Sequence, residues 1–106
     1  MAKYLFKARY DAEGVKGLLK EGGSGRRDAV ANLAESLGGR LEALYFAFGD
    51  DDVYSIVDLP DHASAVALSL TVAASGAGGV STTVLLTPED LDAAARKSPQ
   101  FRPPGG

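Results

Sequence analysis

The chain has 106 residues, a length that fits one domain. Its formal net charge of −3 argues against a general nucleic-acid binder, which needs a basic surface to neutralise phosphates. The absence of cysteine excludes disulfides and thiol chemistry, and a single histidine excludes a site with several histidine ligands from one chain. No stretch reads as a signal peptide or membrane span, so we expect a cytoplasmic protein without a membrane partner.

The first third of the chain predicts one strand and an interrupted helix. Apolar and charged residues alternate over 3–10, which is typical of a strand, with Tyr4 and Phe6 on its buried side. Asp11 then predicts a helix start. Glycines around 22–25 interrupt that helix, and Ser24 restarts it. The pair at 38–39 ends it, because glycine tolerates the left-handed conformation that follows many helices.

The rest of the chain predicts a hairpin, a second helix, a fourth strand and a short last helix. Residues 40–48 and 52–58 form the hairpin around an acidic turn. The second helix opens at Pro60-Asp61 and runs to about residue 75, and the fourth strand covers 80–86. Thr87-Pro88-Glu89-Asp90 is a strong signal for the start of a helix.

This order of elements predicts an α+β, ferredoxin-like fold. The pattern is βαββαβ with a four-stranded antiparallel sheet, both main helices on one face and a short C-terminal helix appended. We expect one domain over residues 1–98 and a tail rich in proline and glycine over 99–106.

The face of the sheet that the helices leave open is the informative one. Alternation along the strands predicts that it carries Leu5, Lys7 and Arg9 from the first strand, Glu42, Leu44, Phe46 and Phe48 from the second, and Tyr54, Ile56 and Asp58 from the third. The fourth strand leaves two choices, Thr83 with Leu85 or Thr82 with Val84. Monomers rarely expose apolar patches of this size, so we expect a homodimer or higher oligomer that pairs these faces.

The same face is where we expect any ligand. A small acidic or aromatic molecule would meet aromatic walls and two cations there, and the candidate binding residues are Lys7, Arg9, Glu42, Phe46, Phe48 and Tyr54. Tyr54 or Glu42 are the groups that could transfer a proton. The alternative is that these charges pair across the sheet, as Lys7 with Glu42 or Arg9 with Asp58.

Other polar motifs favour structural interpretations. His62 opens the second helix, where an exposed, structural histidine is expected. The acidic turn at 50–52 lacks the companion ligands of a cation site, so no metal is predicted. Arg26 and Arg27 are expected to pair with Glu21 and Asp28 at the surface.

The segment Gly76-Ala77-Gly78-Gly79 has the composition of a phosphate loop but the wrong order around it. It follows a helix and precedes a strand, which is the reverse of a dinucleotide-binding loop, so it is interpreted as the helix stop. No cofactor is predicted.

One set of motifs resembles the GYD domain family. Leu37-Gly38-Gly39-Arg40-Leu41-Glu42-Ala43 precedes an aromatic strand, a Gly-x-x-Asp turn at Gly49 to Asp52, and an aliphatic strand ending in Pro60-Asp61. Asp51 stands where the family's tyrosine is expected, so the resemblance implies no role for a tyrosine there. The family is similar to the dimeric α+β barrel group, whose members pair their open sheets.

The resemblance implies a fold and does not select an activity. Related groups include cofactor-free monooxygenases, isomerases, haem enzymes and amino-acid-sensing domains, and a shared fold does not fix function. We consider three hypotheses: a small-molecule-binding homo-oligomer, a cofactor-independent enzyme acting on an aromatic or keto substrate, and a purely structural interaction module. Whether the protein is an enzyme, and with which catalytic residues, is left open by the sequence.

Overall fold

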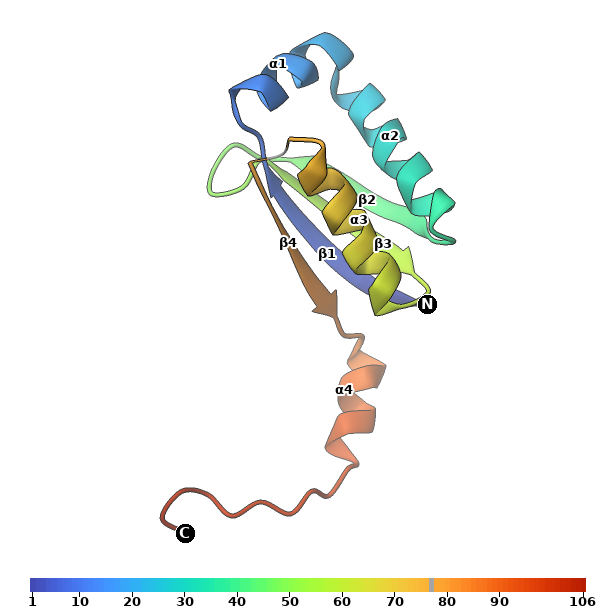
Figure 1. The fold of residues 1–106 in the computed structure, drawn as a ribbon. Helices are drawn as coiled ribbons and strands as arrows, with labels where there is room; N and C mark the ends of the chain where they lie inside the picture. Colours follow the sequence, from blue (N-terminus) through green and yellow to red (C-terminus); the bar gives the residue numbers. More distant parts are fainter. Residues whose placement is uncertain (77) are drawn as a thin grey trace.

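The computed structural model describes residues 1–76 and 78–106, and Ala77 of the glycine-rich segment lies outside the described residues (Figure 1). The elements are β1 (Ala2–Arg9), α1 (Ala12–Glu21), α2 (Gly23–Ser36), β2 (Arg40–Phe46), β3 (Val53–Leu59), α3 (His62–Ala74), β4 (Gly79–Leu85) and α4 (Pro88–Ala95). Each predicted element is present. The interrupted helix restarts at Gly23, one residue before Ser24.

The strands form one antiparallel sheet in the order β2-β3-β1-β4. Helix α2 lies over β2 and β3, while α3 lies over β3 and β4 on the same side (Figure 1). Helix α1 packs mainly against α2, past the end of β1. The predicted α+β, ferredoxin-like fold with an open sheet face is therefore confirmed. In the described part of the chain, none of the helices combines the length and apolar character needed to span a membrane.

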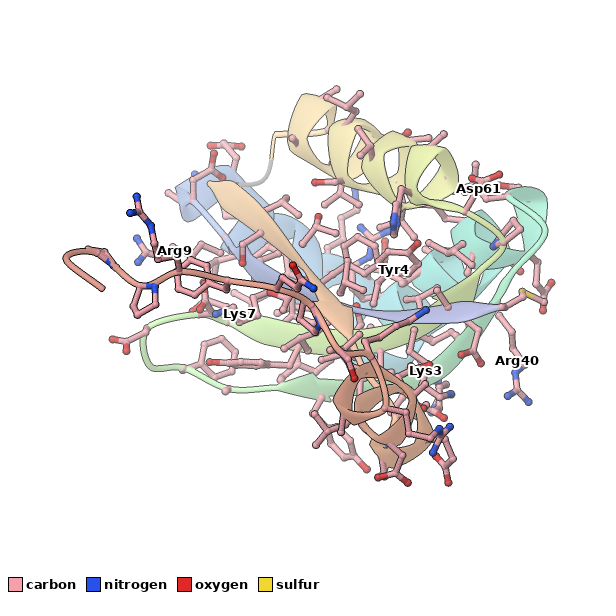
Figure 2. The ribbon with its side chains drawn as sticks, turned by 90° about the horizontal axis from the view of Figure 1, so that it is seen from below. Lys3, Tyr4, Lys7, Arg9, Arg40 and Asp61 are labelled. Atoms are coloured by element: carbon pink, nitrogen blue, oxygen red, sulfur yellow. The ribbon has the colours of Figure 1, made fainter. Side chains whose placement is uncertain are left out.

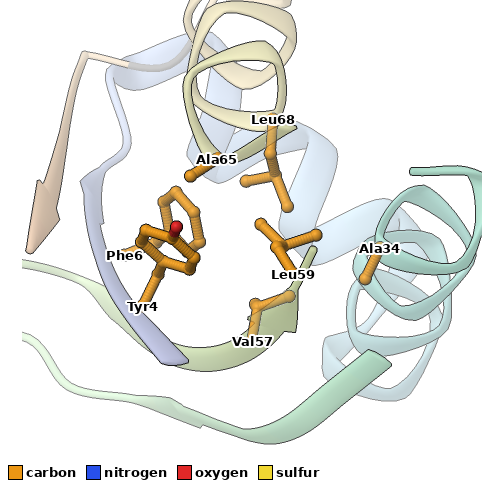
Figure 3. Packing of buried hydrophobic residues seen from close by; sticks show 7 residues of the cluster. All are labelled: Tyr4, Phe6, Ala34, Val57, Leu59, Ala65 and Leu68. Atoms are coloured by element: carbon orange, nitrogen blue, oxygen red, sulfur yellow. The ribbon is translucent and has the colours of Figure 1, made fainter. Parts of the chain in front are cut away.

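The core sits between the sheet and the helices. It is formed by Tyr4 and Phe6 from β1, Val57 and Leu59 from β3, Ala34 from α2, and Ala65 and Leu68 from α3 (Figure 3). Small residues on the two helices let them approach the strands closely. The alternation of β1 therefore predicted its buried side correctly.

The two glycines after α2, Gly38 and Gly39, have different structural roles. Gly38 has φ = 81°, a conformation that favours glycine. Its N–H donates to the Glu35 carbonyl and that of Gly39 to the Ala34 carbonyl, which is the hydrogen-bond pattern of a Schellman motif. Gly39 lies so close to β3 that a Cβ there would sit 2.1 Å from the Asp58 carbonyl oxygen. The chain can therefore enter β2 only with glycine at this position.

A β-bulge in β2 overturns part of the predicted alternation. Leu41 pairs with Val57 but Ala43 pairs with Ile56, so Glu42 is an extra residue in β2. Beyond the bulge every side chain changes face. Leu44 and Phe46 therefore point toward the helices, and Tyr45 lies on the open face.

The placement of Leu44 and Phe46 on the open face was thus wrong, because the alternation is broken within the strand. Leu44 pairs with Ser55 and Phe46 with Val53, and both partners lie on the helix side of β3. Phe46 packs its ring against Gly23 at the start of α2.

The pairing of β4 with β1 shows which side chains of β4 lie on the open face. Thr83 pairs with Leu5 and Leu85 pairs with Lys3, so both lie on the open face. Thr82 and Val84 lie on the helix side.

The chain ends in a segment that leaves the domain. Helix α4 and the tail extend away from the sheet, and every residue from 88 to 106 is exposed (Figure 1). The radius of gyration is 17.0 Å. A compact chain of this length would have about 13 Å.

We expect Gly39→Ala to destabilise the fold by about 2–3 kcal/mol or more, because the new methyl group would meet rigid β3 backbone. The matched variant Gly49→Ala, where a Cβ meets nothing within 4 Å, should change the free energy of unfolding by less than about 0.5 kcal/mol. Urea unfolding followed by circular dichroism measures both. Equal stability of the two variants would contradict the close approach at Gly39.

Candidate functional site

A cavity of about 510 Å³ lies on the helix side of the sheet. Its walls come from all four strands and from α1, α2 and α3. The apolar part of the lining is Phe6, Ala8, Leu18, Ala29, Val30, Leu33, Leu44, Val53, Leu68, Val72 and Val80. Ligand pockets typically have this size and a mainly apolar lining with a few converging polar groups.

The cavity exists because α1 fills little of the space beside the sheet. Gly14 and Gly17 face it, and a Cβ at Gly17 would meet nothing within 4 Å. No residue of α1 is buried, and Leu18 is only half-buried. Helix α1 is therefore a thin cover over the cavity and adds little to the core.

The polar part of the lining is Tyr10, Asp11, Glu13, Glu21, Arg26, Ser55 and Ser75. Tyr10 after β1, Arg26 in α2 and Ser55 in β3 are the hydrogen-bond donors that come from three different parts of the fold. Ser55 is buried on the sheet floor. The Arg26 Nε is shielded from solvent and lies 3.5 Å from the Glu21 carboxylate, but it has no hydrogen-bond partner among the described residues. Glu21 therefore balances the charge of Arg26 without a hydrogen bond to Nε, and the other N–H groups of the guanidinium can donate to an oxygen of a bound molecule.

Tyr10 is held in place from both sides. Its backbone N–H donates to Asp52 Oδ2 at 2.7 Å, and its ring lies against Gly14, where a Cβ would be 3.0 Å from the ring. Burial raises the pKa of the Tyr10 hydroxyl, an effect that the positive charge of Arg26 opposes. The hydroxyl is therefore protonated at neutral pH and can donate a hydrogen bond.

Sequence reasoning missed this site, although part of its signal was present. The alternation over residues 3–10 places Tyr10 on the same side as Tyr4 and Phe6, whereas Arg26 was predicted only to pair with Glu21 at the surface. Nothing local indicated that the two share a cavity.

The structure divides the predicted ligand-binding residues between locations. Lys7 and Arg9 line one depression of about 210 Å³ with Asp51, at one end of the sheet. Glu42 lies toward the other end, where it pairs with Lys3. Lys7 and Arg9 are thus brought together, while Lys3 and Arg40 lie at the opposite end (Figure 2).

The predicted aromatic wall does not assemble around these cations. Tyr54 lies opposite Lys7 on the open face, as expected. Phe46 lies on the helix side, and Phe48 follows the end of β2 with 74% of its surface exposed. The bulge at Glu42 is the physical reason for the change at Phe46.

The charge pairs on the open face differ from the expected ones. Asp58, only 8% exposed, accepts from Lys3 Nζ at 2.9 Å and from Arg40 at 3.2 Å. Lys3 also donates to Glu42 at 2.8 Å. The pairs considered as the alternative to a ligand site, Lys7 with Glu42 and Arg9 with Asp58, do not form. The register places Lys3, four residues before Lys7, opposite Asp58.

This cluster shifts the acid–base properties of its members. The hydrogen bond from Lys3 holds the pKa of Asp58 below its ordinary value, and burial opposes that effect. The hydrogen bonds to Glu42 and Asp58 raise the pKa of Lys3. Both groups are charged at neutral pH, so the cluster serves as a structural ion pair.

The remaining motifs have structural partners. Arg26 pairs with Glu21 and Arg27 with Asp28, as predicted. His62 is exposed as predicted, and its Nδ1 shares a 2.7 Å hydrogen bond with the hydroxyl of the buried Tyr4. Within residues 1–76 and 78–106, no group of three or more His, Cys, Asp or Glu side chains is placed to hold a metal ion.

Comparison with known families identifies the chain. The sequence model of the GYD domain matches residues 4–95. The chain belongs to the GYD domain family. Neither a curated protein nor a solved structure matches it significantly.

The turn at Gly49 to Asp52, where the family motif lies, fixes the chain at the end of β1. Asp52 donates its backbone N–H to the Ala8 carbonyl at 2.9 Å, and its side chain accepts from Tyr10. The turn therefore fixes the end of β1 and the residue that enters the cavity. Asp51, at the position of the family's tyrosine, instead lies 3.8 Å from Arg9.

We expect Asp58→Asn to lower the free energy of unfolding by about 1–3 kcal/mol at neutral pH, because Lys3 and Arg40 lose a shielded carboxylate. The pKa of Asp58 is lower in the folded chain than its ordinary 3.8, so its stabilisation is complete above that value. It is lost as the pH falls through the lower, folded-state pKa. Urea unfolding across this range should show the two proteins converging in acid.

The control for this comparison is Glu42→Gln, which removes the more exposed partner of Lys3. Its effect should stay below about 1 kcal/mol. A pH-independent difference between wild type and Asp58→Asn would contradict the ion-pair assignment.

Proposed function

We propose that this GYD domain protein binds a small aromatic molecule that carries one acidic or carbonyl oxygen, in the cavity between its helices and sheet, and that it works as a homodimer. The observation that carries the binding role is the cavity of about 510 Å³, which has apolar walls and polar groups that converge on it. A purely structural module is less well supported, because it would not need an unfilled cavity of this size between its sheet and helices.

The polar groups favour a ligand with one acidic or carbonyl oxygen. Tyr10 and Ser55 offer hydroxyl donors, and Arg26 offers a cation with a shielded N–H. Most of the remaining wall is apolar and suits an aromatic ring, and its acids, Asp11, Glu13 and Glu21, all lie in α1 or at its N-cap. An aromatic acid or an enol therefore matches the site better than a sugar or a nucleotide.

Binding of anilinonaphthalene sulfonate, an aromatic body with one anionic group, tests this chemistry by fluorescence titration. We expect Arg26→Gln to weaken binding about tenfold, as expected for loss of one charge-assisted hydrogen bond. Arg27→Gln is the matched control, since Arg27 pairs with Asp28 and is not among the residues lining the cavity. Equal affinity of the two variants would contradict the assigned role of Arg26.

An uncharged probe separates the anion site from the apolar walls. Phenylnaphthylamine lacks the sulfonate and should bind wild type and Arg26→Gln equally. Ala29→Phe places a ring in the cavity and should reduce binding of both probes. If Ala29→Phe folds and binds both probes normally, the ligand site lies elsewhere.

A second candidate function is a cofactor-independent enzyme acting on an aromatic or keto substrate. The observation in its favour is Tyr10, whose raised pKa keeps a proton available inside an apolar cavity. A ligand that co-purifies unchanged supports binding alone, whereas a chemically altered one supports the enzyme.

The homodimer is supported by the open face of the sheet. Leu5, Tyr54, Ile56 and Leu85 lie there, none of them fully buried, and Tyr45 is 72% exposed. Pairing two such faces would remove this apolar surface from water. The ligand site predicted around Lys7, Arg9, Glu42 and Tyr54 stays a prediction, and it would lie between the paired sheets.

We expect Ile56→Glu to raise the dimer dissociation constant at least about a hundredfold, because a carboxylate would be buried without a partner. Val66→Glu is the control, as Val66 is a 52% exposed residue of α3, on the other side of the sheet. Sedimentation equilibrium measures both variants, with circular dichroism to confirm folding. A wild-type chain that is monomeric at tens of micromolar would refute the dimer.

A further inference from the structure

We propose that residues 86–102, here called the C-terminal arm, pack against a second copy of this chain. The inference rests on the dimer proposed above and assigns part of its interface. It goes beyond the pairing of open sheet faces, because it gives α4 and the tail a partner.

The arm forms a helix that its own chain does not support. Helix α4 has 8 residues and a complete capping box, in which Thr87 and Asp90 satisfy each other's backbone N–H groups. Yet all of its residues are exposed. Isolated helices shorter than about 12–15 residues are marginal in water, so this helix needs an apolar surface to rest on.

The arm exposes large apolar side chains that suit packing on such a surface. Leu86, Leu91 and Phe101 are 73%, 64% and 79% exposed. Ala94 follows Leu91 by three positions and therefore shares its side of α4, whereas Ala93 lies on another side. A stripe of this kind is typical of a helix that packs on one side.

The position of α4 favours a second copy of the chain as the partner. Seen along the sheet, α4 lies on the side opposite α3, which is the side of the open face (Figure 2). A copy seated on that face would lie next to the arm. Two copies related by a two-fold axis would then each hold the other's arm.

Charge supports a protein partner of this kind. The arm's three acids, Glu89, Asp90 and Asp92, are balanced by its three bases, Arg96, Lys97 and Arg102. A segment of zero net charge is unsuited to nucleic acid or an anionic membrane. The acids gather on α4, and the open face offers Lys7, which has no ion pair or side-chain hydrogen bond with the residues that the structure describes.

The first test compares the dimer dissociation constants of the full chain and a chain ending at Thr87, by sedimentation equilibrium. We expect the truncation to weaken the dimer at least tenfold. Ala94→Asp should weaken it severalfold, while the matched Ala93→Asp should leave it unchanged. A full chain that dimerises no more tightly than the truncated one would overturn the arm and leave the sheet-to-sheet dimer standing. A monomeric full chain would refute the dimer as well.

The second test shows which copy the arm touches. Because the chain has no cysteine, Ala93→Cys takes a single spin label, on a side of α4 away from Leu91 and Ala94. Labelled chains are mixed with isotope-enriched wild-type chains, so that line broadening in the enriched chains reports only contacts between copies. We expect broadening on open-face residues. In a second sample the labelled chain is itself isotope-enriched and is diluted with excess unlabelled wild type. Broadening of open-face residues in that sample, with none in the mixed sample, would overturn the proposal, because the arm would then fold back on its own domain.

Discussion

Glu42 is an extra residue in β2, and the β-bulge that it forms decides which later side chains of the strand point toward the helices and which lie on the open face. Without it, Leu44 would leave the cavity wall and Tyr45 would turn toward α2. The bulge also brings the Glu42 carboxylate to Lys3, where the two form an ion pair at 2.8 Å. One residue thus sets the cavity lining and the charge pattern of the opposite face, because side chains on a strand alternate strictly on either side of a bulge.

The two faces of the sheet differ in how they are filled. Near the start of α3 the helix side is densely packed, and Val57 and Leu59 have no exposed surface. Toward the other end, α1 contributes glycines and a half-buried Leu18, so space is left beside Phe6 and Ala8. The domain thus combines a tightly packed core at one end with an unfilled cavity at the other.

Charge is distributed along the open face in a similarly uneven way. Lys3 and Arg40 share the carboxylate of Asp58 at one end, so their charges are balanced within the sheet. At the other end, Lys7 and Arg9 line a depression with only Asp51 as a neighbouring acid. Arg9 pairs with Asp51 and donates to the Asp50 carbonyl at this end, whereas Lys7 has no ion pair with the described residues.

Local signals predicted the elements well, because caps and breakers act through neighbouring residues. Asp11 and Asp61 accept from backbone N–H groups three residues later, and Thr87 forms its capping box with Asp90. Alternation also predicted the buried side of β1, which contains no bulge. The same reasoning failed in β2, because a bulge depends on how two strands align and not on the residues of one strand.

The sequence by itself determined the fold class, the order of elements, the helix end at Gly38-Gly39 and the family. Each of these follows from short-range patterns or from motifs in a fixed order. Only the tertiary structure decided that Tyr10, Arg26 and Ser55 share a cavity and that Lys3 is the partner of Asp58. These residues lie far apart along the chain, and their meeting depends on strand register and on the space that α1 leaves unfilled, which no local pattern records.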